Sequence, residues 1–106
     1  MFVIRATGAA ALAVTVSAPL IDRAWRVVKL QMHLSAAGGA GNLTATKDAI
    51  AGAAYDTLLL TQDMTSIVNL VSDVAWYMAP GDELDLAWAN AGTKTWGLEV
   101  WCEELD

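Results

Sequence analysis

The sequence predicts an all-β fold, an antiparallel β-sandwich of about eight strands, and three observations support this prediction. Apolar residues alternate with polar or small residues over 84–88 and again over 96–100, the period-2 pattern of strands that bury one face. Before the first of these strands, Ala79-Pro80-Gly81-Asp82 places proline and glycine where a type II turn needs them. Residues 90–93 supply a second reversal. Neighbouring strands joined by such turns are expected to pair antiparallel, with one face dry.

Strand-like segments recur along the whole chain at short intervals, with turn residues between them. Residues 67–71 and 74–78 form either two strands or one strand interrupted at 72–73. Residues 47–54 are expected to form an irregular connection, although the alanine-rich stretch 45–60 also admits a helical alternative. The segments predicted to be strands are 2–5, 11–17, 25–34, 43–46 (an edge strand), 55–62, 67–71, 74–78, 84–90 and 96–102.

Strict alternation assigns a face to each side chain within these strands. In the strand over 25–34, Val28, Leu30, Met32 and Leu34 share one face, which leaves Trp25 on the other, mixed and partly exposed face. The residues predicted to meet in one core are Leu30, Leu58, Leu60, Leu86, Trp88 and Leu98. Cys102 shares the parity of Leu98 and is expected to be a buried thiol.

The length and the apolar content predict one domain over residues 1–106. A chain of 106 residues with 56% hydrophobic residues and a mean hydropathy of +0.41 has enough apolar surface for a core. The apolar excess over an ordinary domain predicts further burial against partner chains. The short segment 1–7 is expected to serve as an adaptable N-terminal arm.

The charge pattern argues against nucleic acid and membrane partners. The net charge is −6, and no cluster of lysine and arginine is present, so the charge that neutralises phosphates is missing. No stretch has the length of a transmembrane helix. Residues 9–18 resemble a signal peptide only faintly, and their alternation favours a strand. Cys102 is the single cysteine, which predicts assembly inside a cell rather than a disulfide scaffold.

The sequence lacks the residue combinations that carry most enzyme chemistry. His33 is the single histidine, so neither a Ser-His-Asp relay nor a recognisable set of metal ligands is expected. A Cys102–His33 dyad has no local support, and Asp85 and Glu99 fall on outward positions of their strands. We therefore expect no enzyme, no metal and no cofactor. Residues 38–41 lack the lysine of a phosphate-binding loop and are interpreted as a flexible loop.

Five tryptophans are many for this length, and two of them are candidate interface anchors. Trp25 lies at a strand start, and Trp101 has the parity opposite to the core. Stacking on sugars is the competing interpretation of exposed tryptophan. The neighbours of Trp101 in its own strand offer carboxylates but no amide, and those of Trp25 are also poor partners for sugar hydroxyls. Protein contact is therefore the preferred interpretation.

Several segments together resemble the small β-sandwich virion proteins of tailed bacteriophages. The resemblance extends over residues 25–101. The segments that carry it are 55–62, 74–76, 79–82, 84–90 and 95–100. The Pro80-Gly81-Asp82 turn before an alternating strand also resembles the Gly-Asp turn of tumour-necrosis-factor-like jelly rolls. The chain has neither a cysteine pair nor a long variable loop, which distinguishes it from the receptor-like relatives. The resemblance implies a jelly-roll-like sandwich that forms trimers on a virus particle.

From this resemblance we expect a structural protein of the virion, assembled in the host cytoplasm. The preferred function is a capsid decoration (cement) protein that forms a homotrimer and binds the major capsid protein through broad contacts. The alternative is a tail or fibre component that binds a host-surface glycan. The candidate interface residues are Trp25, Trp101, Gly38, Gly39, Gly41, Asn42, Phe2 and Ile4.

Overall fold

The computed structural model describes residues 1–20 and 22–105, and it confirms the all-β prediction. Eight strands and one short 3-10 helix, Ala53–Tyr55, make up its regular structure within these residues. The strands are β1 (Phe2–Gly8), β2 (Leu12–Ser17), β3 (Trp25–Leu34), β4 (Asn42–Asp48), β5 (Thr57–Asp63), β6 (Asn69–Met78), β7 (Glu83–Trp88) and β8 (Trp96–Glu104).

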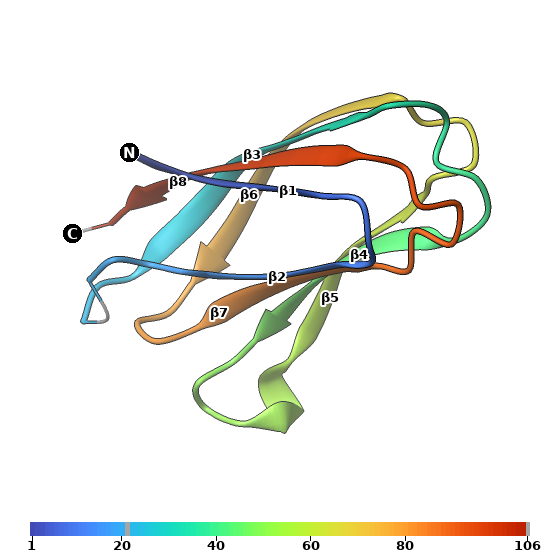
Figure 1. Ribbon diagram of the computed structural model, residues 1–106. Helices are drawn as coiled ribbons and strands as arrows, with labels where there is room; N and C mark the ends of the chain where they lie inside the picture. Colours follow the sequence, from blue (N-terminus) through green and yellow to red (C-terminus); the bar gives the residue numbers. More distant parts are fainter. Residues whose placement is uncertain (21, 106) are drawn as a thin grey trace.

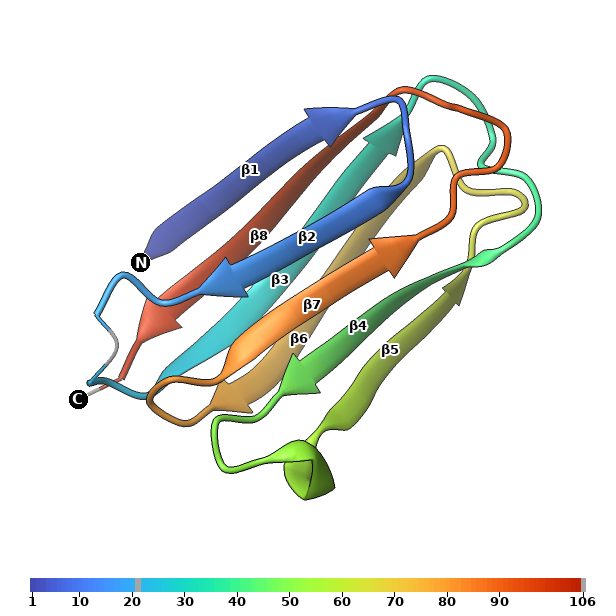
Figure 2. The same ribbon diagram turned by 60° about the horizontal axis from the view of Figure 1, so that its bottom comes forward.

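The strands form two four-stranded antiparallel sheets that pack face to face (Figure 1). One sheet, called sheet A here, has the order β1-β8-β3-β6, and the other, sheet B, has the order β2-β7-β4-β5. The pairs are nested along the chain, since β1 pairs with β8, β2 with β7, β3 with β6 and β4 with β5. Only the β4–β5 connection stays within one sheet, and the other six cross between the sheets (Figure 2). The predicted antiparallel β-sandwich of eight strands is thus confirmed.

The alternating patterns of β7 and β8 fill the space between the sheets as predicted. Leu86, Trp88 and Leu98 are buried in the shared core, and Cys102 is fully buried beside them. Leu30 of β3 joins the same core from the middle of sheet A. The period-2 pattern identifies the buried face correctly wherever a strand is regular.

A bulge in β3 makes the predicted exposure of Trp25 wrong. Val27 pairs with Cys102 of β8 and Lys29 pairs with Trp101, so Val28 is an extra residue on its strand. One inserted residue exchanges the two faces of a strand. Trp25 and Val27 therefore point into the core, and the Trp25 side chain is 0% exposed.

A second irregularity changes the faces of β5. Leu60 pairs with Ala45 of β4, whereas Leu58 pairs with Thr46, so Leu59 is the extra residue. Leu60 packs against the core, as predicted. Leu58 lies on the outer face with 60% of its surface exposed, so its predicted place in the core is wrong. Leu59 is half-buried against the core.

Three further boundaries differ from the prediction. The segment 1–7 is not a free arm, because Phe2–Gly8 pairs along its whole length with β8. Strand β4 is not an edge strand, since β5 and β7 flank it on both sides. Of the two alternatives for 67–78, the single strand is the correct one, but β6 covers 69–78 and is not interrupted at 72–73. The edge strands are β1 and β6 in sheet A and β2 and β5 in sheet B.

The two predicted turns are present, and each is organised by a buried polar side chain. Gly81 has φ +87°, and the Asp82 amide donates to the Ala79 carbonyl over 3.0 Å, as a type II turn requires. The buried Asp82 carboxylate accepts hydrogen bonds from the amides of Ala79 and Ile50. Asn90 organises the second reversal in a similar way and is also buried.

Candidate functional site

The outer face of sheet A carries polar side chains that the strand registers align in rows. Thr7, Gly97, His33 and Asn69 lie side by side across β1, β8, β3 and β6. The next row holds Arg5, Glu99, Gln31 and Val71, and the row after it holds Val3, Trp101, Lys29 and Asp73. These residues are far apart in the sequence, and only the sheet brings them together.

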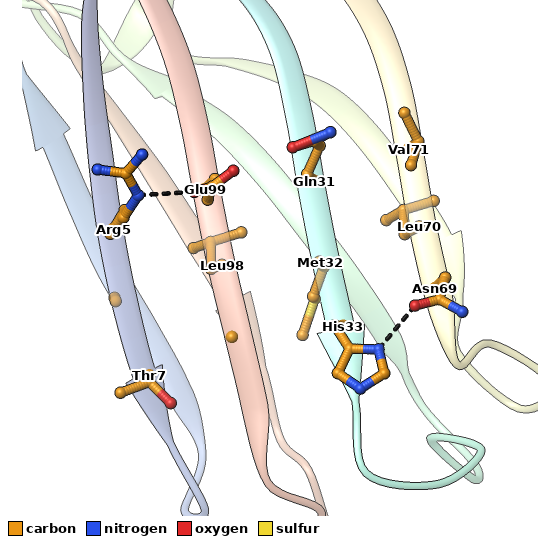
Figure 3. A pocket seen from close by; sticks show the side chains of 12 residues that line it. Arg5, Thr7, Gln31, Met32, His33, Asn69, Leu70, Val71, Leu98 and Glu99 are labelled. Carbon is orange, nitrogen blue, oxygen red and sulfur yellow. Dashed lines mark hydrogen bonds and ion pairs between the residues drawn. The ribbon is translucent and has the colours of Figure 1, made fainter.

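A hollow of about 590 Å³ lies over the first two rows (Figure 3). We call it the Gly97 groove, and its outward-facing residues are Arg5, Thr7, Gln31, His33, Asn69, Val71, Gly97 and Glu99. The hollow exists because Gly97 has no side chain on a central strand. A Cβ atom built on Gly97 would meet no other atom within 4 Å. The volume is within the range of pockets that bind small ligands.

Two pairs of polar groups flank the Gly97 groove. The Arg5 guanidinium donates to the Glu99 carboxylate over 2.6 Å, and this contact holds the pKa of Glu99 below its ordinary value. At the other side, His33 Nδ1 lies 2.6 Å from Asn69 Oδ1 (Figure 3). Since an amide oxygen only accepts, Nδ1 donates in this contact, and Nε2 of a neutral ring is then free to accept. His33 is exposed, as the sequence predicted for a surface histidine.

A second, smaller hollow of about 240 Å³ adjoins the Gly97 groove and holds the outward face of Trp101. Its other lining residues are Met1, Val28, Lys29 and Gln31, so Gln31 borders both hollows. Trp101 is half-buried on the outer face, which agrees with its off-core parity. The sequence-based argument considered only the strand of Trp101, which has no amide side chain, whereas the sheet places Gln31 of β3 in the lining of the same hollow.

Most of the large exposed apolar side chains lie on or beside two edge strands, and one of them, Val71, also lines the Gly97 groove. We call this group the β5–β6 flank, after the two edge strands that run through it. Its members lie on β5, on β6 or in the connections that adjoin them. They are Ile50, Tyr55, Leu58, Val68, Val71 and Tyr77, and only Met1 and Leu20 are comparably exposed elsewhere among the described residues.

The interior next to the β5–β6 flank is also incompletely covered. Leu60 of β5 and Val74 and Trp76 of β6 face the core but remain only partly buried. Both edge strands therefore combine unpaired backbone groups with apolar side chains. Natural proteins usually protect such edges with charges, proline or a covering element. Asp73 is the one charged residue within β6, and β5 has Asp63 only at its end.

The predicted interface residues have different positions in the structure. Trp25 is buried and contacts Phe2, with ring centroids 6.1 Å apart, so it is not a surface anchor. Phe2 and Ile4 are half-buried and pack against the core. The Trp25 prediction failed because the parity rule assumed a regular strand.

The glycine loop at 38–42 is partly a packing element. Gly38 is buried, and a Cβ there would lie 2.6 Å from the Met64 carbonyl oxygen. Gly39 and Gly41 have φ of +78° and +113°, and Gly41 and Asn42 are exposed. The exposed part of the loop is thus Gly41 and Asn42, with Gly39 half-exposed, and Gly38 is inaccessible to a partner.

The thiol and the imidazole are not brought together. Cys102 points into the core, whereas His33 points outward from sheet A. Burial raises the pKa of the Cys102 thiol to about 12, so the thiolate required for nucleophilic attack is scarce at neutral pH. In residues 1–20 and 22–105, no group of three His, Cys, Asp or Glu side chains is placed to hold a metal ion.

Sequence reasoning missed both the Gly97 groove and the β5–β6 flank. A glycine at an outward position of a strong strand was the available signal for the groove. Successive leucines over 58–60, which cannot all share one face of a regular strand, were the signal for the flank.

Comparison with known proteins gives no relative from which a site can be transferred. The sequence matches no protein-family model, and it matches none of the curated proteins with which it was compared. In the described part of the chain, no helix is long and apolar enough to cross a membrane.

Proposed function

We propose that this protein is a structural subunit of a bacteriophage virion, a decoration (cement) protein that stabilises the capsid through protein–protein contacts. The observation that carries the proposal is the β5–β6 flank. Six of the eight large exposed apolar side chains among the described residues lie on the edge strands β5 and β6 or in the connections that adjoin them. Clusters of this kind on soluble proteins mark surfaces that associate with other chains.

We infer that the sandwich is a jelly roll, which supports the same proposal. In a jelly roll, one long antiparallel hairpin folds over so that its strand pairs are divided between two sheets. The nested pairs of this chain, from β1 with β8 to β4 with β5, follow that pattern. Jelly rolls are the architecture of many capsid proteins. Fold alone does not give function, so the phage assignment rests on the sequence resemblance and the assembly role rests on the flank.

The proposed assembly is a homotrimer that buries the β5–β6 flank between its protomers. The β3–β4 connection, which contains the exposed Gly41, lies at the end of the sandwich away from both termini (Figure 1). We propose that this end meets the major capsid protein. Each contact is modest, and the symmetry of the particle multiplies it. The protein would then reside in the virion after assembly in the host cytoplasm.

The trimer is tested by sedimentation of the parent and of two matched variants. Leu58→Asp places a charge on the flank, whereas Leu20→Asp places the same charge on an exposed leucine outside it. We expect a trimer for the parent and for Leu20→Asp, and a smaller species for Leu58→Asp. A parent that sediments as a monomer, or a Leu58→Asp variant that stays trimeric, would contradict the proposed interface.

The capsid contact is tested by mixing the three proteins with undecorated capsids of the phage whose genome encodes the chain. Co-sedimentation of the parent and of Leu20→Asp with the capsids supports the decoration function. Failure of the parent to bind undecorated capsids would overturn it. Deletion of residues 1–7 is unsuitable as a test, because it removes β1 from sheet A.

A further inference from the structure

We propose that the Gly97 groove binds a neutral oligosaccharide. The groove lies on the outer face of sheet A, and the inference does not depend on the decoration function. Its shape suits an extended ligand, because the two hollows meet at Gln31 and together follow three rows of the sheet. Gly97 has no side chain, so the groove is unobstructed at this position.

The free polar groups in the groove include both hydrogen-bond donors and acceptors, and sugar hydroxyls can pair with both kinds. The Gln31 side chain forms no hydrogen bond to any residue in 1–20 or 22–105, although it is half-buried. The Asn69 amide nitrogen and His33 Nε2 are left over from the His33–Asn69 contact. The groove thus offers amide donors beside a carbonyl and an imidazole acceptor, and a hydroxyl can donate and accept at once.

The charges in the groove select a neutral ligand. The Arg5 guanidinium is compensated by Glu99 at 2.6 Å, and the Lys29 ammonium is compensated by Asp73 at 3.8 Å. Among the described residues that line the two hollows, each lysine and arginine side chain therefore has a carboxylate partner and is not left free for a phosphate, a sulfate or a sialic acid. The charges of a ligand usually complement those of its binding surface. Because each ion pair in the groove combines one positive and one negative side chain, the groove fits a ligand without net charge.

Trp101 supplies the apolar contact that a sugar ring needs. It lies one row away from the Gly97 hollow, on the same face, and its indole is half-buried in the second hollow. Its Nε1 lies 3.4 Å from Glu99 Oε1, a contact that orients the ring. Aromatic side chains with one exposed face commonly form such platforms. A neutral oligosaccharide would therefore place one residue over Gly97 and another beside Trp101.

The test uses the full chain on an array that carries neutral hexose and N-acetylhexosamine oligomers beside sialylated and sulfated glycans. Gly97→Val fills the floor of the groove, and the free space at this position keeps the fold intact. Ala87→Val is the matched control, since Ala87 also faces outward from an inner strand, in sheet B. The strongest neutral oligomer is then titrated against all variants by calorimetry.

We expect neutral oligomers to bind the parent and Ala87→Val, and binding to Gly97→Val to weaken by roughly tenfold or more. Gln31→Ala should also weaken binding, with unchanged thermal unfolding. Binding of charged glycans alone, of no glycan, or of neutral oligomers to Gly97→Val as tightly as to the parent would overturn the inference. Gly97→Val should still sediment with undecorated capsids, so failure of the glycan site and failure of the decoration function give different results.

Discussion

Leu58 of β5 lies opposite Thr46 of β4 on the outer face of sheet B, whereas Leu60 lies opposite Ala45 on the inner face. Two leucines separated by one residue thus have opposite surroundings. Leu58 is 60% exposed, and Leu60 packs against the core. This difference allows stability and association to be tested separately on one strand.

Replacing each leucine with alanine should separate the two roles. Leu60→Ala should lower the free energy of unfolding by about 2 kcal/mol, the low end of the range for core leucines, because its side chain is only partly buried. Leu58→Ala should change it by less than about 0.5 kcal/mol, as at other surface positions. Urea unfolding at low protein concentration, where association does not contribute, measures both. Equal effects of the two substitutions would mean that the bulge at Leu59 is absent.

Gly81→Val should lower stability by about 1–3 kcal/mol, because a residue with a Cβ atom is strained at positive φ. The φ of Gly81 is +87°, and a new Cβ would also lie 3.2 Å from Ile50 Cγ1. Gly97→Val is the control, since its added atoms meet open space in an extended strand. Thermal unfolding of both variants provides the comparison. If Gly81→Val melts with the parent, the type II turn is wrongly assigned.

Regular strands and turns were predictable from the sequence, since local pattern decides them. The alternation over β7 and β8 identified Leu86, Trp88 and Leu98 as core residues, and the Pro80-Gly81 pair identified the turn between β6 and β7. Each of these features depends on residues that are neighbours in the chain. The alternation of apolar and polar residues in the sequence is therefore enough to predict which side chains of these strands are buried.

The bulges and the surfaces were not predictable in this way. An extra residue at Val28 or Leu59 leaves no mark in composition, yet it exchanges the faces on one side of the strand, as the burial of Trp25 shows. The Gly97 groove depends on a register that joins residues from β1, β3, β6 and β8. Such non-local pairing is set by the packing of the whole sandwich.

Asn90→Ala should destabilise the protein by at least about 2 kcal/mol, because it leaves several backbone groups without a partner. The buried Asn90 amide donates to the carbonyls of Ala9, Ala10 and Lys94, and its oxygen accepts from the Lys94 amide. These bonds tie the β1–β2 connection to the β7–β8 connection. Asn90 also has φ +50°, which asparagine tolerates better than alanine.

Two companion variants sharpen the Asn90 test. Asn90→Asp keeps the acceptor but loses the donors, so it should be at least as harmful as Asn90→Ala at neutral pH. Asn42→Ala changes an exposed asparagine and should stay within about 0.5 kcal/mol of the parent. Chemical denaturation compares all three. A parent-like Asn90→Asp variant would show that the amide donations contribute nothing.

Asp48 and Asp63 should affect stability with opposite sign at pH 7. Desolvation, and then the charges of Asp56, Asp85 and other nearby carboxylates, raises the pKa of Asp48 above its ordinary value of 3.8. Hydrogen bonds from the Thr65 hydroxyl and amide lower the pKa of Asp63. Folding therefore disfavours the ionised form of Asp48 and favours that of Asp63. Asp48→Asn should stabilise the protein at pH 7, and Asp63→Asn should destabilise it.

The pH dependence follows from the direction of each pKa shift. The cost of ionised Asp48 is fully present above its raised folded-state pKa and disappears as pH falls to 3.8, where the unfolded chain also takes up the proton. The contribution of Asp63 is fully present above 3.8 and is lost as pH falls through its lowered folded-state pKa. Urea unfolding at pH 7 and near pH 3 should thus show both variants closer to the parent at the lower pH. An Asp48→Asn variant less stable than the parent at pH 7 would show that the acidic surroundings of Asp48 do not oppose its charge.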